Sequence, residues 1–230
     1  MNKIRIFSLG DSPALPFAMR ALEKQGIPRA DAPENATHLL LNVPTPPMDL
    51  EAFPAVGTVI GGNLQQLPDT YAKVDLLQDA QYVAENAALT ADCALRLLGQ
   101  YLEVSFRNCP ILVIGWGRIG KCLAKLLQSC GAKVTVAARN PADRGMLTAL
   151  GYQAVDIKDI EPARYRGILN TAPAPVLEAF DGDCVRIDLA SKPGLAGEDV
   201  LWARKLPGKM LPESAGELIA QGVLRHLSEG

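Results

Sequence analysis

The sequence predicts an α/β fold with two parallel-sheet domains joined by a long helix. Three observations predict it: short apolar runs alternate with helical periodicity in both halves, a long helical pattern lies between them, and one apolar run leads into a glycine-rich turn. The expected parts are a small N-terminal α/β domain (1–84), the linking helix (85–104), a Rossmann-like domain (105–211) and a C-terminal helix that packs back toward the first domain (212–230).

The N-terminal domain is expected to alternate strands and helices around a small parallel sheet. A helix is predicted from Pro13 to Gln25, where Gly26 stops it. The first turn, Gly10-Asp11-Ser12, lacks the later glycines of a dinucleotide site, so we assign no cofactor here. Strands are predicted over 3–10, 38–43, 58–60 and 74–77.

The linking helix is predicted from an apolar stripe at helical spacing. Asn86 or Thr90 is expected to cap its N-terminal turn. The residues of the stripe are Leu89, Cys93, Leu97, Leu98 and Leu102.

A G-x-G-x-x-G turn follows the apolar run 111–114, which is expected to be a buried strand. Gly115 permits the tight turn, Gly117 lets a diphosphate approach the backbone, and Gly120 lets helix and strand pack closely. A helix up to Gly131 and a strand over 133–138 would complete a βαβ unit. The pattern predicts a dinucleotide site with its phosphates at the helix N-terminus; the alternative is a glycine-rich turn without a ligand. The turn residues assigned to the cofactor are Gly115, Trp116, Gly117, Arg118, Ile119 and Gly120.

The end of the second strand of this unit selects the cofactor. NAD sites usually place Asp or Glu there to bind the ribose 2′-hydroxyl, whereas this chain has Ala138, Arg139 and Asn140. Because an arginine can pair with a 2′-phosphate, the sequence favours NADP, with Arg139 on the phosphate and Asn140 nearby, and NAD as the alternative. Asn140 is also a good N-cap before Pro141, and the two roles are compatible.

Polar loops follow the later strands, at the edge where parallel sheets bind ligands. Asn170 and Thr171 are expected to contact the nicotinamide ribose or amide. Lys192 is expected to neutralise a substrate carboxylate or transfer a proton. Turn formation alone is the alternative role for each residue. Ala172, Pro173, Ala190 and Ser191 complete the expected cofactor contacts.

The rest of the C-terminal domain is expected to continue the alternation of strands and helices. The last helix should open with a capping box at Ser214 and Glu217 and end near Leu227. Strands are predicted over 154–157, 167–169 and 184–189.

Composition excludes several classes of protein. The formal charge of −2 gives no reason to expect nucleic-acid binding, and no apolar run reaches membrane-spanning length. Two histidines exclude a His-rich metal site, and no metal site is expected. Five scattered cysteines without a C-x-x-C pair indicate reduced core residues of a cytoplasmic protein.

From about Asn86 to the C-terminus, the chain resembles the A subunit of dipicolinate synthase. The run Asp-Leu-Ala-Ser-Lys-Pro-Gly (188–194) is the most specific shared feature. The other features are an Asn-containing segment (86–92), the G-x-G-R-x-G turn (115–120), a strand ending Ala-Arg (138–139), an Asn-Thr-x-Pro loop (170–173), Leu-Pro-Gly (206–208) and x-Pro-x-x-Ala-Gly (ending at 216).

The N-terminal part departs from this family. The chain is shorter there, the first turn lacks the family's arginine, and Glu213 stands where a basic residue is usual. The absent arginine and the acidic Glu213 each remove positive charge that could face an acidic substrate.

The resemblance implies an NADP-dependent oxidoreductase of sporulation, in the mother-cell cytoplasm, that works with a flavoprotein-like B subunit. The implied substrate is a small dicarboxylate, dihydrodipicolinate or hydroxy-tetrahydrodipicolinate, and the product is dipicolinate. Cations that could hold its carboxylates are Lys192, Arg118 and Lys209. Thr90 and Asp92 could face the same site, with Asp92 as a proton acceptor or as a helix-dipole partner only.

Two other functions remain open at this point. One is a catalytically silent NAD(P)-binding sensor or scaffold, favoured by the missing basic residues. The other is a 2-hydroxyacid dehydrogenase, which usually needs a histidine base; His226 lies too late in the chain for that arrangement. The sequence leaves the oligomeric state open, with a homo-oligomer as one possibility.

Overall fold

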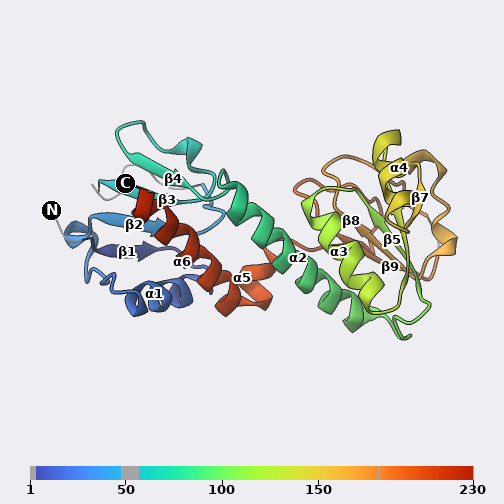
Figure 1. Ribbon diagram of the computed structural model, residues 1–230, viewed down its shortest axis with the longest axis horizontal. Coiled ribbons are helices and arrows are strands. Elements are labelled where there is room, and N and C mark those ends of the chain that lie inside the picture. Colours follow the sequence, from blue (N-terminus) through green and yellow to red (C-terminus); the bar gives the residue numbers. More distant parts are fainter. Residues whose placement is uncertain (1–3, 48–56, 181, 230) are drawn as a thin grey trace. The chain divides into compact units, whose positions relative to one another are not determined.

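The computed structural model describes residues 4–47, 57–180 and 182–229. Its contacts divide the chain into two compact units, Met1–Leu89 with Pro207–Gly230, and Thr90–Leu206. Each unit is built on a parallel sheet with helices packed against it (Figure 1). The predicted α/β class with two parallel sheets is confirmed. Helix α2 (Ala80–Tyr101) runs from the first unit into the second.

The first unit carries a parallel sheet in the order β1-β2-β3-β4. Helices α1 and α6 lie side by side (Figure 1), so closely that a β-carbon on Gly216 would lie 2.5 Å from the carbonyl oxygen of Ala14. Their buried faces, Met19 and Val223 among them, share a core with Leu40 and Ile60 of the sheet. The elements are β1 (Ile6–Leu9), α1 (Leu15–Lys24), β2 (His38–Leu41), β3 (Thr58–Gly61), β4 (Ala72–Asp75), α5 (Leu206–Met210) and α6 (Pro212–Glu229), with 3₁₀ turns at Pro33–Asn35 and Leu64–Gln66.

The second unit carries a parallel sheet in the order β10-β9-β8-β5-β6-β7. The chain starts in the middle at β5, runs out to β7, and returns to β8 on the other side of β5, so the strand order reverses between β5 and β8. The elements are β5 (Pro110–Ile114), α3 (Arg118–Ser129), β6 (Lys133–Ala137), α4 (Pro141–Ala149), β7 (Gln153–Val155), β8 (Gly167–Asn170), β9 (Val185–Asp188) and β10 (Leu201–Trp202), with 3₁₀ turns at Ile157–Asp159 and Pro162–Arg164.

The start of the linking helix differs from the prediction. It begins at Ala80 because Asp79 caps it: the Asp79 carboxylate accepts hydrogen bonds from the amides of Gln81 (2.8 Å) and Tyr82 (3.1 Å). The expected caps, Asn86 and Thr90, therefore lie inside the helix.

Several other boundaries also differ. Helix α6 begins at Pro212, a residue suited to the first helical position, so the expected cap at Ser214 is wrong. Strand β7 ends at Val155 because Asp156 caps the 3₁₀ turn that follows. The two-residue strand β10 and the short helix α5 were not predicted. Lys3, the expected start of the first strand, lies outside the described residues.

Candidate functional site

The turn between β5 and α3 has the geometry of a phosphate-binding turn. Gly115 has φ +101°, a conformation that favours glycine, and Gly117 is the N-cap residue directly before helix α3. A β-carbon on Gly120 would overlap the carbonyl oxygen of Gly115, so only glycine allows this approach of helix and strand. A β-carbon on Gly117 would meet no atom within 4 Å. The backbone at Gly117 therefore faces open space, with the first amides of α3 beside it.

Thr171 supports this turn from the neighbouring strand. Its backbone amide (2.8 Å) and its hydroxyl (2.9 Å) both donate to the carbonyl oxygen of Ile114, the last residue of β5. The hydroxyl also lies where a side chain on Gly115 would be. The Thr171 hydroxyl thus donates its hydrogen bond to the backbone of β5 and helps to hold the turn.

The loop after β6 is held by an arginine that the sequence analysis missed. Nη1 of Arg144 donates to the carbonyl oxygens of Ala138 and Arg139, both at 2.7 Å, and lies 3.0 Å from the Asp156 carboxylate. Ala138 is buried, whereas the Arg139 side chain is exposed beyond the strand end. The Asn140 side chain accepts from the Ala142 amide at 2.9 Å, so it caps α4. The backbone of the loop after β6 is therefore fixed, and the charged side chain of Arg139 stays exposed.

The loops after β8 and β9 are joined by a buried pair of side chains, Asn170 and Asp188. Neither side chain is exposed, and Nδ2 of Asn170 donates to Oδ1 of Asp188 at 3.0 Å. The Asn170 amide also donates to the carbonyl of Ala172 and accepts from its N–H, both at 3.0 Å. Both polar atoms of the Asn170 amide therefore have partners within the protein, and the side chain shapes the loop after β8.

The loop after β9 turns its polar residues outward. Ala190 is buried, and its carbonyl accepts from the indole of Trp202 at 3.2 Å. Ser191 and Lys192 are exposed, and the Ser191 carbonyl accepts from Arg204 at 2.6 Å. In the Asn-Thr-x-Pro loop, Pro173 is exposed and Ala172 half-buried. The side chain of Lys192 is thus exposed to solvent, whereas the backbone just before it is held by Trp202 and Arg204.

The two residues expected from the linking helix lie on α2. Asp92 accepts two hydrogen bonds from the guanidinium of Arg96, at 3.2 and 3.1 Å, one helical turn later. Thr90 is half-buried on the same helix. The Asp92 carboxylate therefore lies in an exposed ion pair with Arg96 on the same helix.

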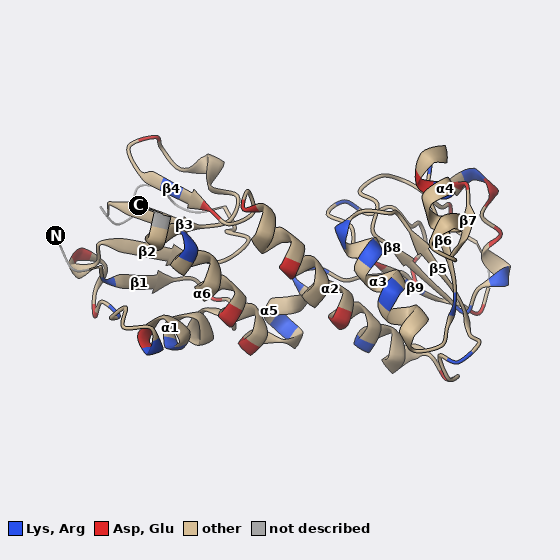
Figure 2. Ribbon diagram, in the orientation of Figure 1, with Lys and Arg blue, Asp and Glu red and all other residues tan. Residues whose placement is uncertain are grey.

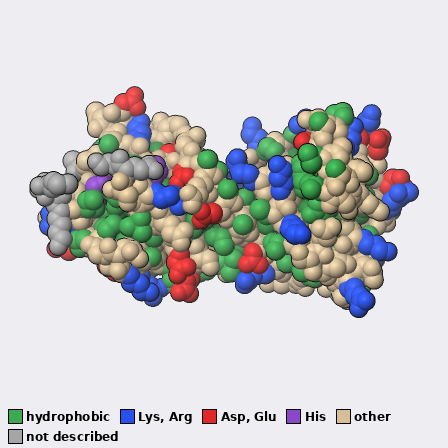
Figure 3. All heavy atoms as spheres, in the orientation of Figure 1, with side chains coloured by type: hydrophobic (Ala, Val, Ile, Leu, Met, Phe, Trp, Pro, Cys, Tyr) green, Lys and Arg blue, Asp and Glu red, His purple; other side chains and the backbone are tan. Residues whose placement is uncertain are grey.

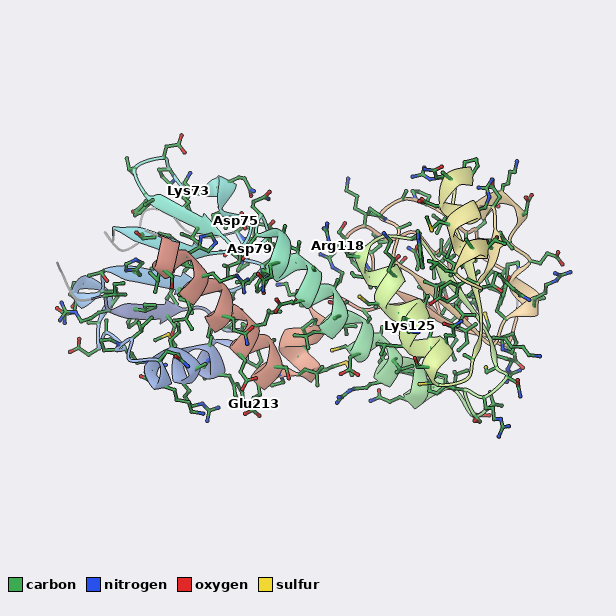
Figure 4. All side chains as sticks on the ribbon, viewed as in Figure 1. Lys73, Asp75, Asp79, Arg118, Lys125 and Glu213 are labelled. Carbon is green, nitrogen blue, oxygen red and sulfur yellow. The ribbon has the colours of Figure 1, made fainter. Side chains whose placement is uncertain are left out.

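Basic side chains gather on the α3 side of the second unit (Figures 2 and 3). Arg118, Lys121 and Lys125 are exposed along α3, and Figure 4 places Arg118 at its N-terminal end. In the described parts of the chain, none of these three pairs with a carboxylate. Their charge adds to that of the helix N-terminus in attracting an anion.

The arrangement is suited to a bound dinucleotide. Hydrogen-bond donors and positive charge lie along the edge of the sheet where the strand order reverses. They are supplied by the open backbone at Gly117, the first amides of α3 and the exposed Arg118 and Arg139. The described residues contain no group of three His, Cys, Asp or Glu side chains that could hold a metal ion. In the same residues, no helix is both long and apolar enough to cross a membrane.

No protein-family model matches the chain. The A subunit of dipicolinate synthase from Bacillus subtilis (strain 168) is 27% identical over 178 residues, which cover 68% of this chain and 58% of the relative. The crystal structure of the same subunit from Bacillus halodurans matches with a TM-score of 0.83 and 22% identity, over 99% of both chains. The crystal structure of the Bacillus subtilis protein matches with a TM-score of 0.78 and 19% identity, over 100% of this chain and 97% of the other.

The resemblance to the A subunit of dipicolinate synthase is therefore confirmed in sequence and in fold. The sequence match spans somewhat more than half of the curated relative's length, 58%.

Proposed function

We propose that this chain is an NADP-dependent oxidoreductase that acts like the A subunit of dipicolinate synthase. The observation that carries the proposal is the turn at 115–120, whose glycines leave backbone amides open to a diphosphate. The likeness to the dipicolinate synthase protein of Bacillus subtilis supports the reaction class.

In this proposal the cofactor lies along the carboxyl edge of the second sheet. The turn from Gly115 to Gly120, with Trp116, Arg118 and Ile119, binds the diphosphate. Arg139 binds the 2′-phosphate, because its guanidinium is exposed beyond β6 and Arg144 fixes the loop that carries it. Asn140 keeps its place as the cap of α4 beside that phosphate.

The proposed substrate is a small dicarboxylate, a dihydrodipicolinate or hydroxy-tetrahydrodipicolinate. The cofactor, when bound, would accept a hydride from a ring carbon. Conversion of the dihydro compound to dipicolinate releases that hydride and one proton, whereas the hydroxylated compound also loses water. Lys192 and Arg118 are the exposed cations that we assign to the carboxylates. Because Arg96 engages the Asp92 carboxylate, we assign Asp92 no proton and expect water to carry it.

We further propose that a B subunit is needed for turnover. The curated relative is described as one subunit of its enzyme, and the first unit of this chain lacks the basic residues noted above. A flavoprotein-like partner is the class that the resemblance implies.

The test is a reaction of the purified chain with NADP⁺ and freshly formed dihydrodipicolinate, with and without the partner. We expect NADPH and dipicolinate to appear in equal amounts. The Lys192→Ala variant should raise KM for the substrate and leave NADPH affinity unchanged. The absence of both products in the presence of the partner would reject the proposed reaction.

A silent NAD(P)-binding sensor is the second candidate, and the first unit favours it. At the end of β1, the Asp11 carboxylate is held by the side-chain amide of Asn42 at 2.7 Å, and Glu213 lies in the first turn of α6 (Figure 4). The two basic residues that the resemblance would place in this unit are therefore absent from it. NADPH binding without turnover under all the conditions above would favour the sensor.

A further inference from the structure

The carboxylate of Asp188 is buried among hydrogen-bond donors. Oδ1 accepts from the Asn170 amide and the backbone N–H of Ala190, both at 3.0 Å, and Oδ2 accepts from the N–H groups of Gly194 (2.6 Å) and Leu195 (2.9 Å). Asp188 has no exposed surface, and no Lys or Arg of the described residues pairs with it. Four uncharged donors therefore replace water around this charge.

One donor, Asn170, is the last residue of β8, and the other three lie in the loop that follows β9. The Gly194 carbonyl accepts from the Val176 amide at 2.8 Å, which ties the loops together a second time. A β-carbon on Gly194 would lie 2.5 Å from the Ala174 carbonyl oxygen and from Nδ2 of Asn170. The carboxylate and the glycine together fix the path of residues 189–194, from which Ser191 and Lys192 point into solvent.

The sheet order places this loop pair in one half of the proposed cofactor site. A dinucleotide fold consists of two mononucleotide halves that meet where the strand order reverses. Here β5, β6 and β7 form the half that carries the glycine turn and Arg139, and β8, β9 and β10 form the other half. Asp188, the last residue of β9, belongs to the second half.

We propose that Asp188 is a positioning residue for the nicotinamide half of the cofactor: its buried carboxylate holds the loops 170–176 and 189–195 in the arrangement that receives the nicotinamide riboside. The inference rests on the proposed function. It assigns Asp188 no contact with the substrate and no part in proton transfer.

An isosteric variant tests the role of the carboxylate. Asp188→Asn keeps the size of the side chain, but all four partners are donors, so the new NH₂ group must face a donor. The loops should therefore separate locally. Hydrogen bonds to a charged group contribute more free energy than those between neutral groups, and the variant loses them around Asp188. We therefore expect NADPH affinity to fall about tenfold or more.

The readout compares NADPH with 2′,5′-ADP, a fragment that contains the 2′-phosphate and lacks the nicotinamide riboside. Binding of both is measured by calorimetry for the full chain and for the variant. We expect weakened NADPH binding and an affinity for 2′,5′-ADP within about twofold of the wild-type value. Equal losses for both ligands, or no loss for either, would overturn the inference. A matched control, Asp183→Asn in the loop before β9, should change neither affinity.

A measurement on the unaltered protein covers the case in which Asp188→Asn does not fold. Amide hydrogen exchange over 189–196 should slow when NADPH is added and stay unchanged with 2′,5′-ADP. Slowing by both ligands, or by neither while both bind, would overturn the inference but leave the proposed cofactor intact. A wild-type chain that binds neither ligand would reject the proposed function and this inference with it.

Discussion

Gly120 and Gly115 approach so closely that a β-carbon on Gly120 would overlap the carbonyl oxygen of Gly115. The contact lies at the start of α3 and sets the distance between this helix and β5. The same turn leaves Gly117 facing open space. Close packing on one side and open backbone on the other make this turn a place where a diphosphate can reach unpaired amides.

Replacing Gly120 by alanine should therefore abolish NADPH binding. The added methyl group displaces α3 from β5, at a cost of about 1–3 kcal/mol in the free energy of unfolding. Calorimetry measures binding and urea denaturation measures stability. The matched control is Gly145→Ala on α4, where a β-carbon meets no atom within 4 Å; it should bind NADPH normally and gain about 0.5–1 kcal/mol. Normal NADPH binding by Gly120→Ala would refute this description of the turn.

Arg139→Asp should reverse the cofactor preference. The new carboxylate repels a 2′-phosphate and can accept a hydrogen bond from a ribose 2′-hydroxyl, so the ratio of NADPH to NADH affinity should fall by about tenfold or more. Lys133→Asp makes the same charge change at the opposite end of β6 and should leave the ratio alone. An unaltered ratio in Arg139→Asp would show that another group selects the cofactor.

Arg144→Met should destabilise the second unit. Methionine keeps most of the apolar stem but loses the bonds to the carbonyls of Ala138 and Arg139 and the ion pair with Asp156. Because these groups are about three-quarters buried, the expected loss is about 1.5–3 kcal/mol in urea denaturation. Arg164→Met removes a solvent-exposed ion pair with Glu161 and should cause no measurable loss. Similar stabilities for the two variants would contradict the bracing role of Arg144.

Acid should weaken the first unit through Asp79. Burial by itself would raise the pKa of Asp79, but hydrogen bonds from Arg225 and from the amides of Tyr82 and Gln81 outweigh it, so the pKa lies below its ordinary value. A carboxyl whose pKa is lower in the folded state contributes stability above its unfolded pKa, about 3.9, and loses it as the pH falls through the folded value.

Asp79→Asn isolates this charge, because asparagine can still cap α2. We expect the free energy of unfolding of the variant to be about 1.5–3 kcal/mol lower at pH 7, because the ion pair with Arg225 is lost. The difference from wild type should vanish when the pH falls below the folded pKa of Asp79, where the wild-type carboxyl is also uncharged. Denaturation curves across that range measure both. Asp69→Asn, which alters a fully exposed partner of Lys73, serves as the control and should leave stability unchanged at every pH. A loss in Asp79→Asn that does not depend on pH would assign the effect to packing.

The sequence predicted the parts of the site that depend on local pattern. Local sequence patterns were sufficient for three features of the site. They are the strand before Gly115, the helix after Gly120 and the position of Arg139 after β6. The hydrogen bonds that Asn170 and Thr171 make within the protein did not follow from the sequence. Both are polar residues after a strand, and only the neighbouring strands show that their side chains bond inward.

Long-range contacts also explain what the sequence analysis missed. Arg144 lies within a helical pattern, and its partners at the ends of β6 and β7 come together only in the folded sheet. Asp188 reads as the polar end of a strand, and its four donors lie two to eighteen residues away along the chain. The cap at Asp79 does not follow from the apolar stripe, because the first residue of the stripe, Leu89, lies well inside helix α2.

A crystal structure of the full chain with NADP⁺ tests the central claim most directly. We expect the diphosphate to accept hydrogen bonds from the backbone amides between Gly117 and Ile119, with the 2′-phosphate beside Arg139. An empty turn in crystals that bind the nucleotide elsewhere, or a turn closed by the Trp116 side chain, would contradict the account.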